Sequence, residues 1–208
     1  MAFNIETATK SFDQSEDIFT DIKLPINISK DFIGLILSPF KEDVKYLKSA
    51  QILDYFDPSV KSEVAKNIFN LLSIEGRFSI SESSLLNNRG DFSMNEFNIC
   101  YTQLAYVLFG KCIQIGLLQG LLYDWAEKVN ITFNAYFKHQ PSSLYIVKSE
   151  SNFLQPLSTM SFRGKLTISR IVCAQQTALV NTKIIFSDAQ GIKSEGLVVL
   201  EFKIFNSL

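Results

Sequence analysis

A short turn before the most apolar helical stretch carries the side chains best suited to catalysis. Asp91 and Glu96 are the two carboxylates near this turn, with Ser93 between them. A carboxylate in an apolar cleft has its pKa raised towards the working range of a general base. The same residues could instead cap the helix, because Ser93 and Glu96 have the spacing of a capping box and Asp91 is a good N-cap residue. We favour capping for Glu96 and leave both roles open for Asp91.

Backbone amides at the amino end of this helix could stabilise negative charge that develops on a substrate oxygen. The first N–H groups of a helix have no partner within it, and the helix dipole also favours an anion there. Gly90 and the amides of residues 92–95 are placed for this role. Preorganised donors of this kind are worth roughly 3 kcal/mol each.

Residues 94–109 predict a buried helix with a polar line along one side. At about 100° per residue, the large apolar residues cluster on one side, and the opposite side carries Asn95, Asn98, Thr102 and Tyr106. A helix this apolar should be largely buried, so the polar line needs hydrogen-bond partners or a cavity. The alternative is a line that simply reaches solvent. Thr102 could orient water or a carbonyl group, but it cannot act as a base at neutral pH.

His139 is the single histidine of the chain, so any Ser-His-Asp arrangement would have to use it. Its ordinary pKa suits proton transfer, but its expected position at the start of a strand favours a structural hydrogen bond to the neighbouring backbone. One histidine and three cysteines without a C-x-x-C pair indicate neither a metal site nor a disulfide framework. We therefore expect no metal and no cofactor, with buried structural thiols at Cys100, Cys112 and Cys173.

Composition and charge argue against several classes of protein. Apolar residues make up 47% of the chain, enough for a substantial core, and the formal net charge of −1 without a basic block argues against a nucleic-acid partner. Polar residues and glycines interrupt the longest apolar stretch, residues 107–123, which argues against a membrane span. The first residues are acidic where a secretory signal would be basic and then apolar, so we expect a cytoplasmic protein.

The pattern of apolar residues predicts a loose polar arm over residues 1–25 and a single domain over residues 26–208. Before the buried helix we expect a helix, a strand, a helix and a strand, at residues 26–40, 45–56, 62–72 and 76–85. After it we expect a short helix around Trp125 and then four strands, at residues 142–153, 161–173, 178–187 and 196–205. This order outlines an α+β fold in which an antiparallel sheet wraps a central helix.

Several sequence blocks, in order, resemble the FcoT-like fatty acyl-CoA thioesterase family. The first, RGDFSMNEFNICYTQLAY over residues 89–106, is similar to the family's G-H-F-N turn and its N-Q-L-A-Y helix block. The second, HQPSSLYIVK over residues 139–148, follows the pattern H-Q-x-S-S-x-x-I-x-K, and weaker matches lie near residues 45–51 and 156–166. The resemblance implies a hot-dog fold and a dimer or higher oligomer that binds fatty acyl thioesters of coenzyme A or an acyl carrier protein.

Several residues that the family uses are replaced in this chain. By register the family's two functional tyrosines fall on Phe40 and Leu85, its two functional asparagines on Ser93 and Thr102, and its turn histidine on Asp91. Ser93 and Thr102 keep a hydrogen-bonding oxygen. The lost side chains argue against the family's ordinary catalysis. The residues that do match are Glu96, Gln103, Tyr106 and His139.

Three functions remain open at this point. Hydrolysis of a medium-chain or long-chain acyl thioester is the function that the resemblance implies. The second is addition or elimination across a 2,3-unsaturated acyl thioester, either hydration and dehydration or Michael addition of an amine such as glycine. This chemistry needs an oxyanion hole and one acid or base but no water nucleophile, so the lost side chains favour it slightly. The third is a non-catalytic acyl-thioester binder or an inactive partner in a heteromer.

The polar line and the helix terminus together suggest how a substrate would lie. We expect the acyl chain along the polar line, the thioester carbonyl near the amides of Phe92 and Ser93, and Asp91 as the base. Thr102 would orient water or the acyl α-carbon. Lys148, Arg163 and Lys165 could meet coenzyme A phosphates or an acidic carrier protein, although a solvated strand face is the simpler explanation. Further substrate contacts are expected from Phe40, Leu85, Gly90, Asn95, Asn98, Tyr106 and His139.

Overall fold

The computed structural model describes residues 23–55, 72–81, 92–118, 131–174 and 177–203. The candidate site residues Leu85, Gly90 and Asp91 therefore lie outside the described residues. The same holds for most of the expected arm, for all but the last residue of the helix expected at 62–72, and for the helix expected around Trp125.

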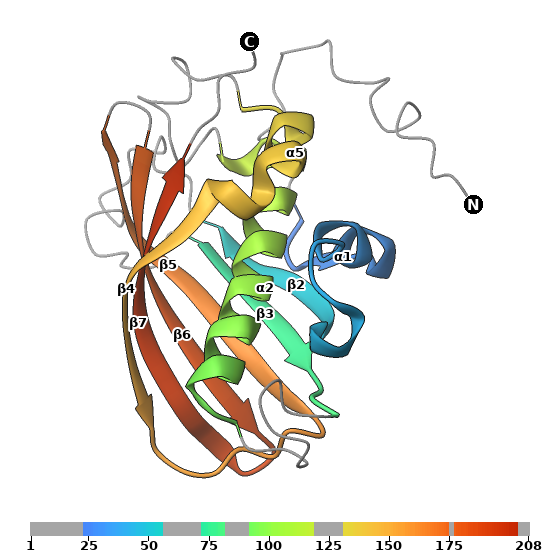
Figure 1. The fold of residues 1–208 in the computed structure, drawn as a ribbon, viewed down its shortest axis with the longest axis vertical. Coiled ribbons are helices and arrows are strands. Elements are labelled where there is room, and N and C mark those ends of the chain that lie inside the picture. The colour runs from blue at the N-terminus through green and yellow to red at the C-terminus, as the bar shows by residue number, and fades with distance from the viewer. Residues whose placement is uncertain (1–22, 56–71, 82–91, 119–130, 175–176, 204–208) are drawn as a thin grey trace.

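One long helix, α2 (Met94–Gln114), forms the centre of the domain (Figure 1). It confirms the expected buried helix and continues five residues beyond the expected end at Phe109. The chain leaves the helix through Gly116, whose φ of +76° lies in the left-handed region that favours glycine. The apolar side of α2 is fully buried and includes Phe97, Cys100, Tyr101, Leu104 and Leu108.

A seven-stranded antiparallel sheet wraps around α2 in the order β1-β2-β3-β5-β6-β7-β4 (Figure 1). Side chains along each strand alternate between a face that contacts α2 and an outer face turned away from it. This is the α+β hot-dog arrangement that the sequence predicts. The strands are β1 (Ile26–Ile28), β2 (Leu47–Tyr55), β3 (Leu72–Phe78), β4 (Leu144–Phe153), β5 (Phe162–Ala174), β6 (Thr177–Asp188) and β7 (Gly191–Lys203).

Shorter helices flank the central one. α1 (Lys30–Ile36) packs beside α2 and β2, and a 3-10 turn, η2 (Glu42–Val44), leads into β2. α5 (Phe133–Ser143) lies across the carboxyl-terminal part of α2, at the end of the sheet opposite the start of that helix (Figure 1). The amino-terminal part of α2 therefore lies at the end of the domain that α5 does not reach.

Three of the expected element boundaries are wrong. The helix expected at 26–40 is a strand followed by a helix, because Ile26–Ile28 pair with β2 and Ser29 caps α1 by accepting the Phe32 N–H at 3.2 Å. The strand expected at 76–85 begins at Leu72, where the inward side chains are already buried. The strand expected at 196–205 begins at Gly191, because a tight turn pairs that residue directly with Asp188.

α5 corrects the expected position of His139, which lies in a helix and not at the start of a strand. Thr132 caps this helix by accepting the Ala135 N–H at 3.2 Å. Tyr136 and Gln140 lie one turn apart and are both buried, which stabilises the helix by packing. A proline in the interior of a helix normally breaks it, but Pro141 lies in the last turn of α5 and the helix continues to Ser143.

Candidate functional site

A capping box closes the amino end of α2. Ser93 is the N-cap: its side-chain oxygen accepts the Asn95 N–H at 3.2 Å, and the Glu96 carboxylate accepts the Ser93 N–H at 3.2 Å. The Ser93 hydroxyl also donates to Glu96, whose side chain is fully buried. The capping box expected from this spacing is confirmed. The Ser93 N–H, which we expected near a substrate carbonyl, is engaged by Glu96.

Phe92, the residue before the cap, lies in a cluster of phenylalanine rings. Its ring centroid is 5.0 Å from that of Phe186, 5.3 Å from Phe162 and 6.2 Å from Phe153. It also lies 6.4 Å from Phe97, the pairing of a hydrophobic staple. The rings place apolar material beside the helix terminus, although Met94 and Asn95 remain exposed, and N–H groups next to apolar material act more strongly on an anion than they would in water. Sequence reasoning did not bring these rings together.

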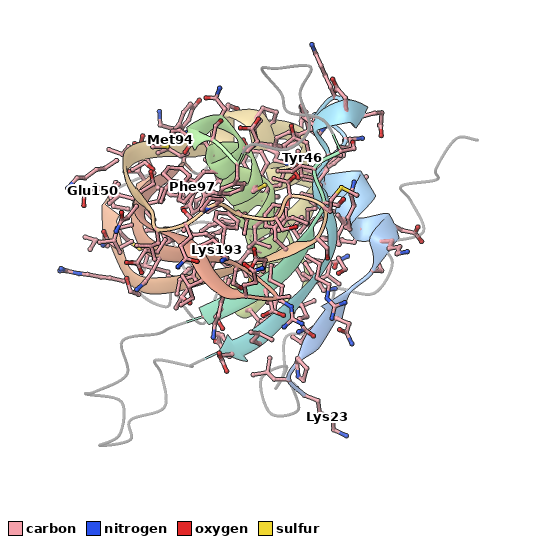
Figure 2. All side chains as sticks on the ribbon, turned by 90° about the horizontal axis from the view of Figure 1, so that it is seen from below. Lys23, Tyr46, Met94, Phe97, Glu150 and Lys193 are labelled. Carbon is pink, nitrogen blue, oxygen red and sulfur yellow. The ribbon has the colours of Figure 1, made fainter. Side chains whose placement is uncertain are left out.

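A polar cluster at the same end of the domain is structural. Lys193 is 3% exposed, and its ammonium group donates to Gln155 at 2.8 Å and to Gln190 at 3.3 Å. Asp188 lies 3.9 Å away. Figure 2 looks onto this end, with Met94 and Lys193 labelled. The buried charge therefore ties the connection between β4 and β5 to the turn between β6 and β7.

Cys100 lies one turn beyond Glu96 and is completely buried. Burial, and to a smaller extent the Glu96 carboxylate, raise the pKa of this thiol well above its ordinary value. The thiolate is the nucleophilic form of cysteine. Cys100 therefore stays protonated at neutral pH and serves as a structural residue. Cys112 is buried as well, but Cys173 is exposed, so the expectation of a buried thiol is wrong there.

The polar line of α2 passes from solvent into the core. Asn95 is exposed, Asn98 and Thr102 are half-buried, and Tyr106 is 8% exposed. The Asn98 Oδ1 atom is buried and has no hydrogen-bond partner within the described residues. Leaving a buried acceptor unpaired costs roughly 1–3 kcal/mol, so a ligand that donates a hydrogen bond at this point would be stabilised.

Two of the expected substrate contacts meet at the buried end of this line. The rings of Phe40 and Tyr106 lie edge to face, with centroids 5.9 Å apart. Burial, and then the neighbouring Tyr145, raise the pKa of Tyr106, so its hydroxyl stays protonated at neutral pH. Thr102 lies one helical turn before Tyr106 on the same line. The structure therefore brings together Phe40, Thr102 and Tyr106.

Gln103, which matches the family block, holds the fold together. Its side-chain oxygen accepts the N–H groups of Tyr46 and Leu47 at 3.0 Å each, and its amide nitrogen donates to the Val44 carbonyl at 2.5 Å. The side chain is completely buried. It fixes the start of β2 against the middle of α2.

His139 lies far from the capped end of α2. It belongs to α5, in which the Tyr136 hydroxyl donates to the Tyr106 carbonyl at 2.9 Å and the Gln140 amide donates to the Ile36 carbonyl at 2.8 Å. With a rise of about 1.5 Å per residue, Tyr106 is roughly 20 Å along the helix from Ser93. The structure therefore does not bring His139 together with Ser93.

Two further properties concern the described part of the chain only. In it, no group of three or more His, Cys, Asp or Glu side chains is arranged to hold a metal ion. None of its helices is both long enough and apolar enough to cross a membrane.

An antiparallel sheet wrapped around a helix whose capped amino end lies among apolar rings defines a hot-dog protein. Residues 35–202 match the FcoT-like thioesterase domain, and the chain belongs to this family. Two similar proteins are both named (2E)-enoyl-[ACP] glycyltransferase. That of Mycobacterium marinum is 32% identical over 180 residues, which cover 83% of this chain and 85% of the relative. That of Streptomyces coeruleorubidus is 28% identical over 172 residues, which cover 80% and 92%.

Solved structures show more distant similarity. A candidate thioesterase from Shewanella oneidensis aligns with a TM-score of 0.41 and 11% identity, over 84% of this chain and 99% of that one. A Staphylococcus aureus protein in complex with CoA aligns with a TM-score of 0.38 and 14% identity, over 61% and 66%. The family assignment therefore rests on the sequence match.

Proposed function

We propose that this chain adds the amine of glycine to a 2,3-unsaturated fatty acyl group that is held as a thioester on an acyl carrier protein. The observation that carries the proposal is the similarity, over at least 80% of the chain, to two (2E)-enoyl-[ACP] glycyltransferases. The replacement of the family's functional residues also favours an addition reaction over hydrolysis. In an addition reaction the amine is itself the nucleophile, so no side chain has to activate water.

The proposed reaction forms one bond and leaves the thioester intact. The neutral amine nitrogen of glycine bonds to C3 of the enoyl group, and the electrons of the C2–C3 double bond move towards the thioester oxygen. The resulting enolate takes up a proton at C2, while the nitrogen loses one. The product is an N-substituted glycine whose acyl group remains attached to the carrier.

Backbone donors at the start of α2 support the enolate step. The N–H groups of Ser93 and Asn95 are used within the capping box. Those of Phe92 and Met94 make no hydrogen bond to any other described residue. We assign these two amides to the enolate oxygen, in the apolar surroundings of the phenylalanine cluster. The unpaired Asn98 Oδ1 would accept a hydrogen bond from the attacking amine.

Asp91 remains the candidate for proton transfer between nitrogen and C2. Asp91→Asn keeps the size and hydrogen bonding of the side chain but removes the base. Loss of a general base costs about 100-fold in turnover, and the melting temperature should hardly change. Retained activity would show that Asp91 is not the base, and since Ser93 is the N-cap of α2, Asp91 would then have no assigned role. Glu96 and then His139 would be tested next.

Hydrolysis of the thioester is the second candidate, because the family match is to a thioesterase domain. One experiment separates the two reactions. The purified protein is incubated with saturated and 2-enoyl thioesters, on coenzyme A and on carrier protein, with and without glycine. Mass spectrometry should show a glycine adduct that appears only with the 2-enoyl substrate. Release of free thiol from the saturated thioester, without an adduct, would instead support hydrolysis.

The edge strand β4 supports a dimer as the working form. Among the described strands it pairs with β7 alone, and it carries several large exposed apolar side chains. Unpaired strand edges of this kind readily pair with another chain. We propose that two copies join through this edge. The large exposed apolar residues on or beside it are Tyr145, Ile146, Val147, Phe153 and Leu154.

A further inference from the structure

Two arginines lie side by side on the outer face of the sheet. Arg77 of β3 and Arg163 of β5 are direct cross-strand partners, and both side chains are exposed. The Cβ atoms of such partners lie about 4.5–5.5 Å apart, and like charges at these positions repel each other. An anionic ligand that bridged the two guanidinium groups would remove this repulsion.

Carboxylates pair with several lysines of the sheet but not with these two arginines. Within the described residues, neither Arg77 nor Arg163 lies within 4 Å of a carboxylate oxygen. Three exposed lysines of the sheet behave differently, and each of these three has an acidic neighbour. Their pairs are Lys148–Glu150 at 2.6 Å, Lys165–Asp54 at 3.9 Å and Lys183–Glu195 at 3.2 Å.

The arginine pair lies directly behind the candidate site. Arg77 precedes Phe78, the last residue of β3, and Arg163 follows Phe162, the first residue of β5. The rings of these two phenylalanines stack on the inner face at 5.3 Å, and Phe162 is 5.3 Å from Phe92. The arginine pair is therefore close to the end of the domain where α2 begins. It lies on the opposite face of the sheet, and along the strands it is one residue, about 3.4 Å, from the stacked phenylalanines.

A hollow beside Arg77 adds hydrogen-bonding groups to this surface. A pocket of about 210 Å³ across β1, β2 and β3 is lined by Ser49, Gln51 and Arg77, with Glu75 as its acidic member. Its opening onto the sheet gives room for a side chain from another protein. Within the described residues Glu75 forms no ion pair with either arginine, and its direct cross-strand partner is Lys165.

We infer that Arg77 and Arg163 form the docking site for an acidic surface of the acyl carrier protein, and this inference rests on the proposed function. Arginine forks bind carboxylates through two parallel hydrogen bonds. The pair lies on an open sheet face. Such a face is better suited to binding the surface of another protein than to burying the phosphates of a small cofactor. Since the whole chain has a formal net charge of only −1, attraction of an acidic partner depends on such a local cluster.

Charge reversal on one strand tests the docking site with a matched control. Arg163→Glu and Arg170→Glu make the same change in net charge on the same strand, and both side chains are exposed. The substrates are trans-2-decenoyl acyl carrier protein, trans-2-decenoyl coenzyme A and the trans-2-decenoyl thioester of N-acetylcysteamine. For Arg163→Glu and Arg77→Glu, KM for the carrier-bound substrate should rise about tenfold or more, while kcat and the kinetics with the small thioester stay unchanged. Arg170→Glu should behave as wild type.

Several results would overturn the inference. One is an equal effect of Arg163→Glu and Arg170→Glu on the carrier-bound substrate. Another is a rise in KM for the coenzyme A thioester that matches the rise for the carrier protein, which would assign the pair to phosphate binding. A third is a change of oligomeric state in Arg163→Glu without weaker carrier binding, which would assign this face to contact between copies of the chain.

A binding measurement keeps this inference separate from the proposed reaction. If the wild type turns over none of the three thioesters, the proposed function fails. Docking is then decided by titrating fluorescently labelled holo-acyl carrier protein with wild type and variants. Tight binding that weakens about tenfold in Arg163→Glu and falls steeply with salt would support the docking site. No binding to the wild type would overturn it.

Discussion

Replacing Glu96 separates its role as a helix cap from any role in proton transfer. Glu96→Gln keeps an oxygen that can accept the Ser93 N–H, whereas Glu96→Ala removes the acceptor. The Gln variant loses a negative charge near the helix amino terminus, which is worth about 0.3–1 kcal/mol. The Ala variant also loses two hydrogen bonds to a charged group, each worth about 1.5–3 kcal/mol. We therefore expect losses of about 1 and about 4 kcal/mol.

These losses convert into melting temperatures that circular dichroism can resolve. For a domain of this size, 1 kcal/mol corresponds to about 2–4 °C. Glu96→Gln should therefore melt about 3 °C below wild type, and Glu96→Ala about 12 °C below. Ser93→Ala removes the N-cap oxygen, at a cost of about 1–2 kcal/mol, and should fall between them. Glu150→Gln, an exposed carboxylate on β4, is the control and should melt as wild type.

Turnover of glycine and a 2-enoyl thioester completes the test. A residue that only caps can lose its charge without loss of chemistry, so Glu96→Gln should keep a rate close to that of wild type. The reasoning is refuted if Glu96→Gln loses about 100-fold or more in turnover while its melting temperature falls by only a few degrees. In that case the buried carboxylate moves a proton as well as capping the helix.

Four further predictions concern other parts of the molecule. Gln103→Met breaks three buried hydrogen bonds and should lower the melting temperature by about 10 °C; a fall no larger than that of Gln114→Met, near the end of the same helix, would contradict its structural role. Asn98→Ala removes an unpaired acceptor, so stability should not fall while kcat/KM for glycine drops about tenfold; unchanged kinetics would exclude Asn98 from amine binding. If the chain forms the proposed dimer, Val147→Lys on β4 should convert it to a monomer in light scattering, and an intact dimer would place the interface elsewhere. Partial desolvation raises the pKa of the Cys173 thiol, although the residue is exposed. Because the thiolate is the reactive form, the rate of thiol labelling should reach half its maximum above pH 8.5, roughly the pKa of a free cysteine. Full labelling of all three cysteines in the native protein would contradict the burial of the other two.

The long helix and the C-terminal strands could be predicted because their signals are local. Periodic apolar residues mark α2, and residues that favour strands, separated by turn residues, mark β4, β5 and β6 within a few residues of their ends. The spacing of Ser93 and Glu96 was enough to predict the capping box. These features depend on residues that are close together in the sequence, so one sequence is enough to predict them.

The errors have nonlocal causes. Ile26–Ile28 form a strand only because β2 lies beside them, and residues 133–143 form a helix because Tyr136 and Gln140 pack against α2 and α1. The rings around Phe92 come from three different strands, so their meeting depends on strand register. Gln103 shows another limit: its match to a family block could not distinguish a clamp on β2 from a contact with substrate.

The place of β4 in the sheet has a consequence for how the chain folds during synthesis. β4 is made before β5 and β6, yet among the described strands it pairs only with β7, the last of them to leave the ribosome. Until then β4 has no partner in the sheet, and its apolar edge is exposed to other chains. Nascent chains of this protein should therefore depend on chaperones until β7 emerges. A frameshift that removes β7 would leave β4 without a strand partner and one edge of β6 exposed, and should cause aggregation rather than a small loss of stability.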